Sequence, residues 1–439
     1  MINSLWADTA KLPSFPRLEQ DLKTDILIIG GGMAGLLCAC ALNRACADYA
    51  LIEADSICSG VTRNTTAKIT SQHGLIYDKL IREYDEETAR LYYEANQAAI
   101  SHFRKLAVDY PCQMETKSAF VYTTGDSETL EKELRALERI GAKGRYWDDL
   151  PLPFEVTGAI EFEDQAQFHP LLLAAGIAPG LKIYEHTPAR GFEGNTVYTD
   201  KVRIEAKKIL IATHFPIINK HGGSFLKMYQ YRAYVLALEN APDPAGMFIG
   251  AEGCGPSIRR SGELLLFGGG AHRTGKKGGG YAELEALAQS RYPRAGIKYR
   301  WAAQDCMSLD GIPYIGRYGK NTPELYVATG FNKWGMSSSM VSAMVLGDLL
   351  LERENPYTKV FSPQRSSMHP QLLLNALHAV GNLLTPTRPR CPHMGCPLRY
   401  NPANRRWECP CHGSTFDVLG QVEAAPAIRN ARLSPKDRP

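Results

Sequence analysis

Alternating apolar and polar stretches divide this chain into recognisable strands and helices. An apolar run over 26–29 leads into a glycine cluster and then a second apolar stretch up to Leu42, which predicts a buried strand, a tight turn and a helix. The segment YALIEAD predicts the next strand. Further helices are expected over 84–106, 127–141 and 337–352, and strands over 208–215, 228–240 and 263–270. This mixture predicts an α/β protein.

The pattern changes beyond residue 355. Pro370 opens a predicted helix, PQLLLNALHAVGNLL, whose Leu373, Leu377, Val380 and Leu384 share one face. A cysteine-rich segment follows it. The chain therefore divides into a body over 1–355, a linker with a helix over 356–385, and a compact module over 386–439.

Composition places few limits on this picture. The chain has 439 residues, enough for two or three domains, with 44% hydrophobic and 22% charged residues. The longest apolar run is broken by glycines, so we expect no membrane span. The first residues lack the basic and apolar regions of a signal peptide, so we expect a cytoplasmic protein. Its eleven cysteines are then expected to be thiols or metal ligands.

Charge is concentrated at the C-terminal end. The net charge of +4 argues neither for nucleic acid nor for a membrane partner. From Pro386 onward, however, nine lysines and arginines face four acids, which leaves the rest of the chain near −1. A basic module could steer toward an acidic redox partner, and a solvated basic face is an equally good interpretation.

The N-terminal glycines predict a dinucleotide site. Gly30, Gly32 and Gly35 form a GxGxxG turn between a strand and a helix, and Glu53 ends the next strand. The glycines allow close approach of a pyrophosphate, the helix N-terminus stabilises its charge, and Glu53 can bind a ribose hydroxyl.

Motifs along residues 22–355 resemble the D-amino-acid oxidase/glycine oxidase superfamily of FAD-dependent oxidoreductases. They are DILIIGGGMAGL, IEADSICSGVT, KKILIATH, DGIPYIGRY and LYVATGFNKWGM, and they occur in the family's order. The resemblance implies a discontinuous Rossmann-like flavin domain (about 22–80, 160–220 and 300–355) and a mixed-sheet substrate domain (about 81–159 and 221–299). It assigns FAD binding to Gly30, Gly32, Met33, Ala34, Gly35, Glu53, Thr62, Thr65, Thr66, Ala212, Thr213, Gly330, Gly335 and Met336.

The stretch 59–77 matches the family segment that passes beneath the flavin ring. Lys68 and His73 are the polar candidates near the reacting carbon, and His73 is equally well interpreted as a structural histidine. Lys333, before the helix at 337, could add positive charge for a reduced flavin, or be a solvated loop lysine. Cys306 resembles a position that tethers FAD in some relatives, although a plain buried cysteine explains it better.

The second domain is expected to bind substrate. Strand alternation puts Tyr229 and Tyr231 on one face and Arg232 on the other, and Tyr231 and Arg232 are candidate catalytic residues. Relatives that oxidise amino acids often hold the substrate carboxylate with an arginine. The candidates are Arg232, Arg259, Arg260 and Arg273, and the sequence does not choose among them.

Two C-terminal loops, CPHMGC and CPCHGS, predict a metal centre. Zinc is the simplest alternative, but its paired ligands usually have C-x₂₋₄-C or H-x₃₋₅-H spacing, which neither loop has. Both loops resemble a Rieske [2Fe–2S] domain. The resemblance assigns the cluster to Cys391, His393, Cys409 and His412, and implies a disulfide between Cys396 and Cys411. Few residues precede the first loop, so we expect a shortened all-β module that leans on the body or the linker helix.

Together these resemblances imply a flavin dehydrogenase. It would oxidise a C–N bond of an amine or amino acid and pass electrons through the cluster to an external redox protein or quinone-like acceptor. One alternative is a reductase running in reverse, and another is a non-catalytic electron carrier or redox sensor. Phe416 stands where high-potential Rieske proteins carry a tyrosine, which predicts a lower potential. The substrate and any homo-oligomer are left open.

Overall fold

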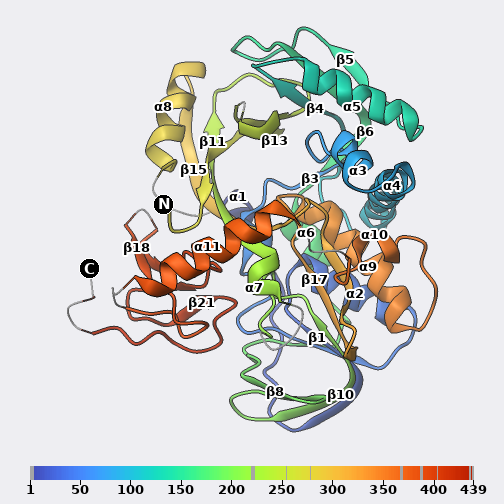
Figure 1. Ribbon diagram of the computed structural model, residues 1–439, viewed down its shortest axis with the longest axis vertical. Coiled ribbons are helices and arrows are strands. Elements are labelled where there is room, and N and C mark those ends of the chain that lie inside the picture. Colours follow the sequence, from blue (N-terminus) through green and yellow to red (C-terminus); the bar gives the residue numbers. More distant parts are fainter. Residues whose placement is uncertain are drawn as a thin grey trace.

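The computed structural model describes residues 4–218, 223–253, 255–276, 278–365, 369–385, 389–402, 404–434 and 437. Figure 1 shows three sheets with helices packed around them, and the C-terminal module lies at one side of the body. The predicted start of the module, at residue 386, falls on residues 386–388, outside the described part of the chain.

The nucleotide-binding part is a mostly parallel sheet. Its strands come from three separated stretches of the chain, as a discontinuous domain requires. In spatial order they are β16 (Tyr314–Gly319), β17 (Thr322–Thr329), β10 (Arg203–Ile211), β1 (Leu22–Ile29), β2 (Tyr49–Ile52) and β7 (Ile183–Tyr184), with β8 (Gly191–Glu193) and β9 (Thr196–Tyr198) attached to β10. β10, β1 and β2 are parallel neighbours, so their carboxyl ends lie at one edge. Ligands bind at this edge in doubly wound sheets.

A larger, mixed sheet forms the second domain. Its strands in order are β15 (Gly296–Ser308), β11 (Met228–Glu239), β14 (Leu264–Arg273), β13 (Ser257–Ser261), β12 (Met247–Gly250), β4 (Glu115–Thr123), β6 (Gly158–Gln167) and β3 (Lys68–Ile69), with β5 (Arg145–Trp147) beside β6. β12 and β4 are parallel, and the remaining pairs are antiparallel. Strand β3 brings the loop around Lys68 from the nucleotide-binding part onto this sheet.

Helices cover both sheets. They are α1 (Leu5–Thr9), α2 (Met33–Arg44), η1 (Val61–Asn64), α3 (Tyr77–Glu83), α4 (Glu86–Asp109), α5 (Glu128–Arg139), α6 (Pro170–Ile177), α7 (Ser224–Lys227), η2 (Ala251–Gly253), α8 (Tyr281–Arg291), α9 (Gly335–Leu350), α10 (Thr358–Phe361) and α11 (Pro370–Leu384). α9 packs against α2 and α4, which closes one core over the parallel sheet. The helices expected over 84–106, 127–141 and 337–352 are confirmed, with ends shifted by one to three residues.

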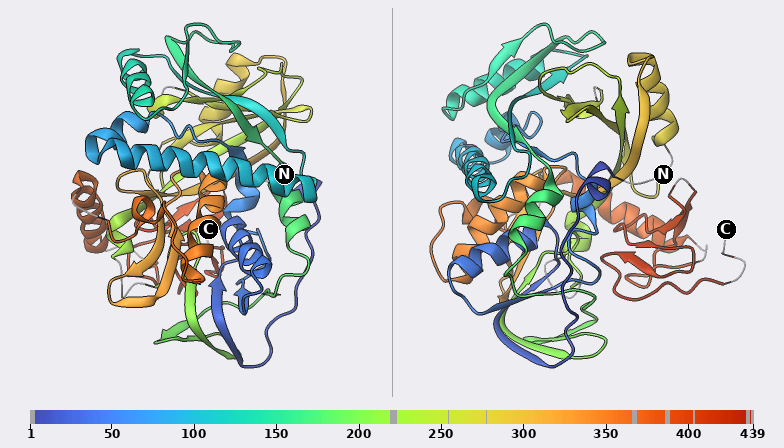
Figure 2. Two further views of the ribbon diagram at one scale, coloured as in Figure 1. Left: turned by 90° about the vertical axis from the view of Figure 1, so that its right-hand side faces the viewer. Right: turned by 180° about the vertical axis from the view of Figure 1, so that it is seen from behind.

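The C-terminal module is a small antiparallel sheet of β18 (Arg399–Asn401), β19 (Arg406–Glu408), β20 (Thr415–Phe416) and β21 (Val422–Ala424). The right view of Figure 2 shows it at one side of the body. The predicted fold class, two α/β domains and a small all-β module, is confirmed. No helix in the described part of the chain is long and apolar enough to cross a membrane.

Candidate functional site

The glycine turn has the geometry of a phosphate cradle. Gly30 has a φ of 113°, and a Cβ there would lie 2.6 Å from the carbonyl oxygen of Ala212. A Cβ on Gly35 would overlap the carbonyl oxygen of Gly30, so strand and helix can pack this closely only with glycine. Gly32 caps α2 without a side chain, and its missing Cβ would make only ordinary contact with Thr62. Gly32 is therefore dispensable for the turn itself but leaves room for a ligand at the helix N-terminus.

Neighbouring predicted residues complete this cradle. Glu53 accepts hydrogen bonds from the backbone N–H of Gly31 at 2.6 Å and of Asp55 at 3.0 Å, which fixes its carboxylate beside the turn. Thr62 accepts the N–H of Met33 at 3.0 Å. Ala212 donates its N–H to Ile29 at 2.8 Å. A helix N-terminus, a hydroxyl and an oriented carboxylate around a glycine turn fit the pyrophosphate and ribose of FAD.

The segment after Thr62 is held from both domains. The indole N–H of Trp6 donates to the carbonyl oxygen of Thr65 at 2.7 Å, and that of Trp301 donates to Asn64 at 2.9 Å. At its far end, Thr70 exchanges two hydrogen bonds with the hydroxyl of Ser337 in α9. The segment is therefore tied to the N-terminus of α9, where Gly335 and the buried Met336 lie. The two tryptophans were missed, since nothing in their local sequence indicates a distant partner.

Both ring nitrogens of His73 have hydrogen-bond partners. It is buried, its Nδ1 lies 2.6 Å from the hydroxyl of Tyr92, and its Nε2 lies 2.8 Å from the carbonyl oxygen of Thr70. The carbonyl can only accept, so Nε2 carries the proton and Nδ1 accepts from the tyrosine. Burial lowers the pKa of His73 to about 3. Both nitrogens are engaged, which favours the structural interpretation of His73 over the catalytic one.

Lys68 has the properties of a neutral amine. Its side chain is buried, and its Nζ donates to Ser257 at 2.6 Å and to Thr66 at 3.4 Å. Burial, assisted by the charge of Arg259, lowers the pKa of Lys68 to about 7. Among the described residues no carboxylate forms an ion pair with it. An unpaired amine with this pKa can take up or release a proton near neutrality.

A polar and aromatic patch occupies one face of β11 and β15. The guanidinium of Arg273 lies 4.9 Å from the ring of Tyr229, whose ring is 6.3 Å from that of Tyr231. The Nζ of Lys333 lies 4.9 Å from the ring of Tyr231. Asp305, opposite Tyr231 in the strand register, has its pKa raised to about 6 by burial. We call these five residues the β11 patch. Asp305 was not selected from the sequence, because in this segment only the neighbouring Cys306 was considered, as a possible attachment point for FAD.

The opposite face of β11 is covered by the module, and this corrects the role predicted for Arg232. Its guanidinium forms an ion pair with Glu408 at 2.8 Å and donates to Gln304 at 2.9 Å. Both side chains of the ion pair are buried, 4% and 3% exposed. Arg232 is therefore a docking residue and is not available to a substrate carboxylate. The alternation of side chains along the strand correctly placed Arg232 on the face away from Tyr231.

The other three arginine candidates differ in their hydrogen-bond partners. Arg259 donates to the carbonyl oxygens of Thr66 and Phe168, and Arg260 donates to those of Gly262 and Ala241. Within the described part of the chain, Arg273 makes one side-chain hydrogen bond, to Asn375 at 3.1 Å, which leaves most of its N–H donors for a ligand. Only Arg273, among the four, lies in the β11 patch.

Cys306 is a buried thiol. It contacts Met228 and Thr329 and belongs to a small apolar cluster with Phe215. Burial raises its pKa to about 12, so it lacks the thiolate character of a reactive cysteine. It also pairs with Gln230 in the strand register, on the face of β11 away from the patch. This agrees with the interpretation of Cys306 as a plain buried cysteine.

The two C-terminal loops bring four ligand side chains together. Cys391 and Cys409 are buried in one cluster of the module, and the rings of His393 and His412 lie 4.9 Å apart. Burial lowers the pKa of His393 to about 3 and of His412 to about 4, so both imidazoles are neutral, as ligands must be. Nδ1 of His412 is buried without a hydrogen-bond partner. Two sulfurs beside two neutral imidazoles fit a Rieske [2Fe–2S] cluster.

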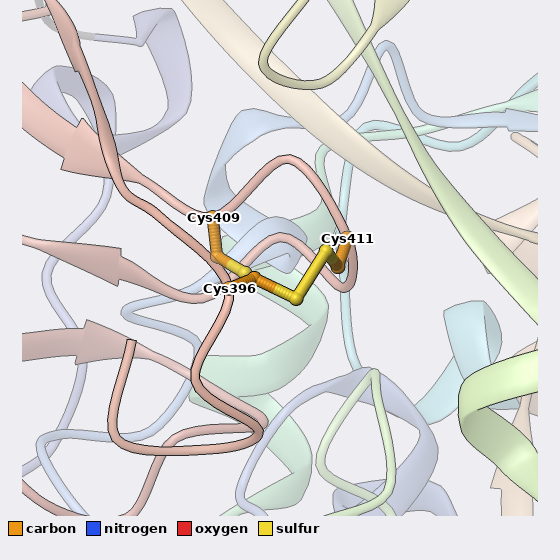
Figure 3. Close-up of side chains that lie close together, drawn as sticks. All are labelled: Cys396, Cys409 and Cys411. Atoms are coloured by element: carbon orange, nitrogen blue, oxygen red, sulfur yellow. A yellow bond between two sulfur atoms is a disulfide. The ribbon is translucent and has the colours of Figure 1, made fainter. Parts of the chain in front are cut away.

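A disulfide joins the two loops. Figure 3 shows Cys396 and Cys411 bonded to each other beside Cys409. The three sulfur atoms lie within 4.8 Å of one another. Since two of them form the disulfide, only Cys409 of this group is available to a metal, in agreement with the predicted assignment.

Comparison with known proteins agrees with this geometry. Residues 25–349 match the family described as FAD dependent oxidoreductase, and residues 373–435 match the Rieske [2Fe-2S] domain. The chain belongs to the FAD dependent oxidoreductases. It carries a Rieske domain at its C-terminal end, and its cofactors are FAD and a [2Fe–2S] cluster; the zinc alternative is set aside.

Two curated relatives and one solved structure are similar to this chain. YhfW of Bacillus subtilis (strain 168), named a Rieske 2Fe-2S iron-sulfur protein, is 34% identical over 97% of this chain and 96% of its own length. Gamma-glutamylputrescine oxidoreductase of Escherichia coli (strain K12) is 23% identical over 78% of this chain and 87% of its own. Glycine oxidase from Geobacillus kaustophilus shares the fold, with a TM-score of 0.66 and 18% identity over 79% of this chain and 99% of its own.

Proposed function

We propose that this protein is a flavin dehydrogenase that oxidises a C–N bond of an amine or amino acid and delivers the electrons through its own cluster to an external acceptor. The acceptor is a redox protein or a quinone-like molecule, and the enzyme works in the cytoplasm, as expected from the sequence. When bound, FAD accepts two electrons as a hydride, and a Rieske cluster carries one electron at a time.

The observation that carries this proposal is the docking of the cluster loops on the flavin-binding body. Nε2 of His412 lies 3.1 Å from the carbonyl oxygen of Phe225. The ring of Phe215, two residues beyond Thr213, lies 5.7 Å from that of His412 and 6.4 Å from that of His393. One aromatic side chain therefore connects a FAD-binding segment with both histidine ligands, which supports electron exchange within one chain.

The docking interface is polar and specific. Besides the buried pair of Arg232 and Glu408, the side-chain amide of Gln304 donates to the carbonyl oxygen of Gly413 at 2.7 Å. A Cβ on Gly413 would lie 2.5 Å from both Gln230 and Gln304. The second cluster loop therefore fits against β11 and β15 only with glycine at this position. Such a fit favours one fixed placement over a freely swinging module.

The protein's own groups account for the other parts of the reaction. Lys68, neutral above about pH 7, can accept the proton that a substrate ammonium must lose before its C–N bond is oxidised. The β11 patch offers Arg273 for a carboxylate and aromatic faces for the amine or the carbon chain. Starting from the ammonium, this oxidation gives the iminium and removes two electrons and two protons; the hydride carries one proton with both electrons, and Lys68 takes the other.

Anaerobic rapid mixing tests the proposal. The purified protein is mixed with amines and amino acids while flavin absorbance and the electron paramagnetic resonance signal of the cluster are followed. Flavin bleaching followed by appearance of the reduced-cluster signal is expected. Bleaching only by a chemical reductant supports the reductase alternative, and no response to any organic substrate supports a carrier or sensor. Stoichiometric hydrogen peroxide at full turnover, unaffected by cluster loss, would overturn the route through the cluster.

A further inference from the structure

Helix α11 exposes its apolar face to solvent, whereas an ordinary surface helix buries that face. Its apolar side chains face outward: Leu373, Leu374, Leu377, Val380 and Leu384 are 66%, 49%, 61%, 54% and 78% exposed. These residues account for half of the large exposed hydrophobic side chains in the described part of the chain. We call them the α11 stripe. At 100° per residue they fall on one side of the helix, so the stripe is continuous.

A polar residue holds the helix in this orientation. Asn375 is 3% exposed and faces the body, opposite the stripe. Its side chain donates to the carbonyl oxygen of Leu226 at 3.0 Å and accepts from Arg273 at 3.1 Å. Turning the leucines inward would break both hydrogen bonds and leave buried polar groups unpaired, which is costly. The exposed stripe is therefore specified by the packing of the helix.

The surroundings of the stripe are positively charged. Partial burial, together with the nearby charges of Arg273 and Lys276, lowers the pKa of His378 in α11. Arg399 donates to the carbonyl oxygen of Gly275, which places it next to Lys276. Both Lys276 and Arg399 are exposed, and neither forms an ion pair with an acid in the described residues. The helix itself carries no acidic residue.

We propose that the α11 stripe is a docking surface for an anionic phospholipid bilayer. An apolar face flanked by unpaired cations matches acyl chains beneath anionic headgroups. A second copy of the chain would cover the leucines but bring like charges to the same interface, whereas anionic lipid neutralises them. The helix has 15 residues, about 22 Å at 1.5 Å per residue, which is too short to cross a bilayer and suits a helix lying in its surface.

The position of the helix makes this contact accessible. Figure 1 shows α11 crossing the front of the molecule beside the module, and in the left view of Figure 2 it lies at the edge of the molecule. A bilayer on this face would lie next to the cluster-bearing module. This inference goes beyond the proposed function, since lipid binding requires neither turnover nor a particular substrate.

Vesicle sedimentation of the full-length holoprotein tests it. Vesicles of equal parts phosphatidylcholine and phosphatidylglycerol are compared with vesicles of phosphatidylcholine alone. Wild-type protein is expected to sediment with the anionic vesicles and to be released by high salt, because the headgroup attraction is screened. The double variant Leu373→Gln with Leu377→Gln is expected to bind at least about tenfold more weakly, since each leucine loses its apolar burial.

Matched controls isolate the stripe. Leu419→Gln replaces a leucine of similar exposure, 58%, in the module and is expected to bind like wild type. Lys276→Gln with Arg399→Gln should weaken binding to anionic vesicles only. Flavin and cluster absorbance confirm that each variant is folded. The proposal is overturned if wild-type protein stays in the supernatant, if the leucine variant sediments unchanged, or if wild type is a dimer that the leucine variant dissociates.

Discussion

The flavin site and the cluster module are built in contrasting ways. The flavin site lies at the edge of a sheet whose strands belong to two large hydrophobic cores, and its shape comes from backbone and glycine. The module has a core of nine buried residues, four of them cysteines, and reaches the body through polar contacts. A core of this size contributes little stability, so a disulfide, a metal cluster and docking have to support the module. Loss of a cofactor should therefore affect the two regions differently.

The largest effect is expected from the cluster ligand Cys409. Cys409→Ser removes one of two sulfur ligands, so iron and acid-labile sulfide should be lost while FAD stays bound. Metal analysis and flavin absorbance measure both. The control, Cys46→Ser, changes an exposed free cysteine and should retain the full iron content. Loss of flavin from Cys409→Ser would mean that the two regions are not separable.

Gly32→Val tests the same separation from the other side. A Cβ on Gly32 meets only Thr62, at 3.4 Å, so the fold should tolerate the substitution. The branched side chain blocks pyrophosphate approach, and FAD should be absent while the cluster signal remains. Gly381→Val, where a Cβ meets nothing within 4 Å, is the control. Retention of stoichiometric FAD in Gly32→Val would contradict the position assigned to the cofactor.

The docking contact should respond to loss of its buried ion pair. Arg232→Gln leaves Glu408 buried without its cation, which typically costs about 3–5 kcal/mol. The expected result is a module that is cleaved more readily in the linker by protease, together with slower electron transfer from flavin to cluster. Arg90→Gln, which breaks two exposed ion pairs in α4, should change neither. Unchanged electron transfer in Arg232→Gln would show that docking does not control the cluster.

The lowered pKa of Lys68 predicts that the rate of substrate oxidation depends on pH, an effect that concerns only the flavin region. Its pKa in the folded protein is about 7, below that of an exposed lysine, so the neutral amine becomes populated as the pH rises through 7. Substrate oxidation should rise over the same range, and Lys68→Met should be about 10²-fold slower without that step. Folding stability should also rise between about pH 7 and 10, because the unfolded chain binds the extra proton there. A flat rate profile in wild-type protein would reject Lys68 as the base.

The smallest effects concern hydrogen bonds at the cluster. The carbonyl oxygen of Ser414 accepts from the N–H of Cys409 at 2.9 Å, its side chain is fully buried beside the cluster loop, and Phe416 is fully buried in β20 without a hydroxyl. Donors to the ligand sulfurs stabilise the reduced cluster, so Ser414→Ala should lower the midpoint potential and Phe416→Tyr should raise it. Redox titration followed by electron paramagnetic resonance measures both shifts. No shift in Phe416→Tyr would show that residue 416 does not face a cluster sulfur.

Sequence alone determined the parts of this protein that depend on local spacing. Strand and helix periodicity, the glycine turn before Gly35 and the loops carrying Cys391 and Cys409 can be read directly, because each needs particular residues within a short stretch. The fold class and both cofactors followed from them. Alternation along β11 also separated Tyr231 from Arg232.

Only the tertiary structure decided which residues contact the faces of these strands and helices. Arg232 could not be assigned to Glu408 from sequence, since 176 positions separate them and only folding brings them together. His73, in a loop, was undecided for the same reason: its hydrogen-bond partner Tyr92 comes from helix α4. The helical pattern over 370–384 predicted an apolar face but could not tell whether that face is buried. Asn375 determines which face of the helix is buried, because its buried amide needs hydrogen-bond partners and these lie on the body. The leucines on the opposite face therefore remain exposed.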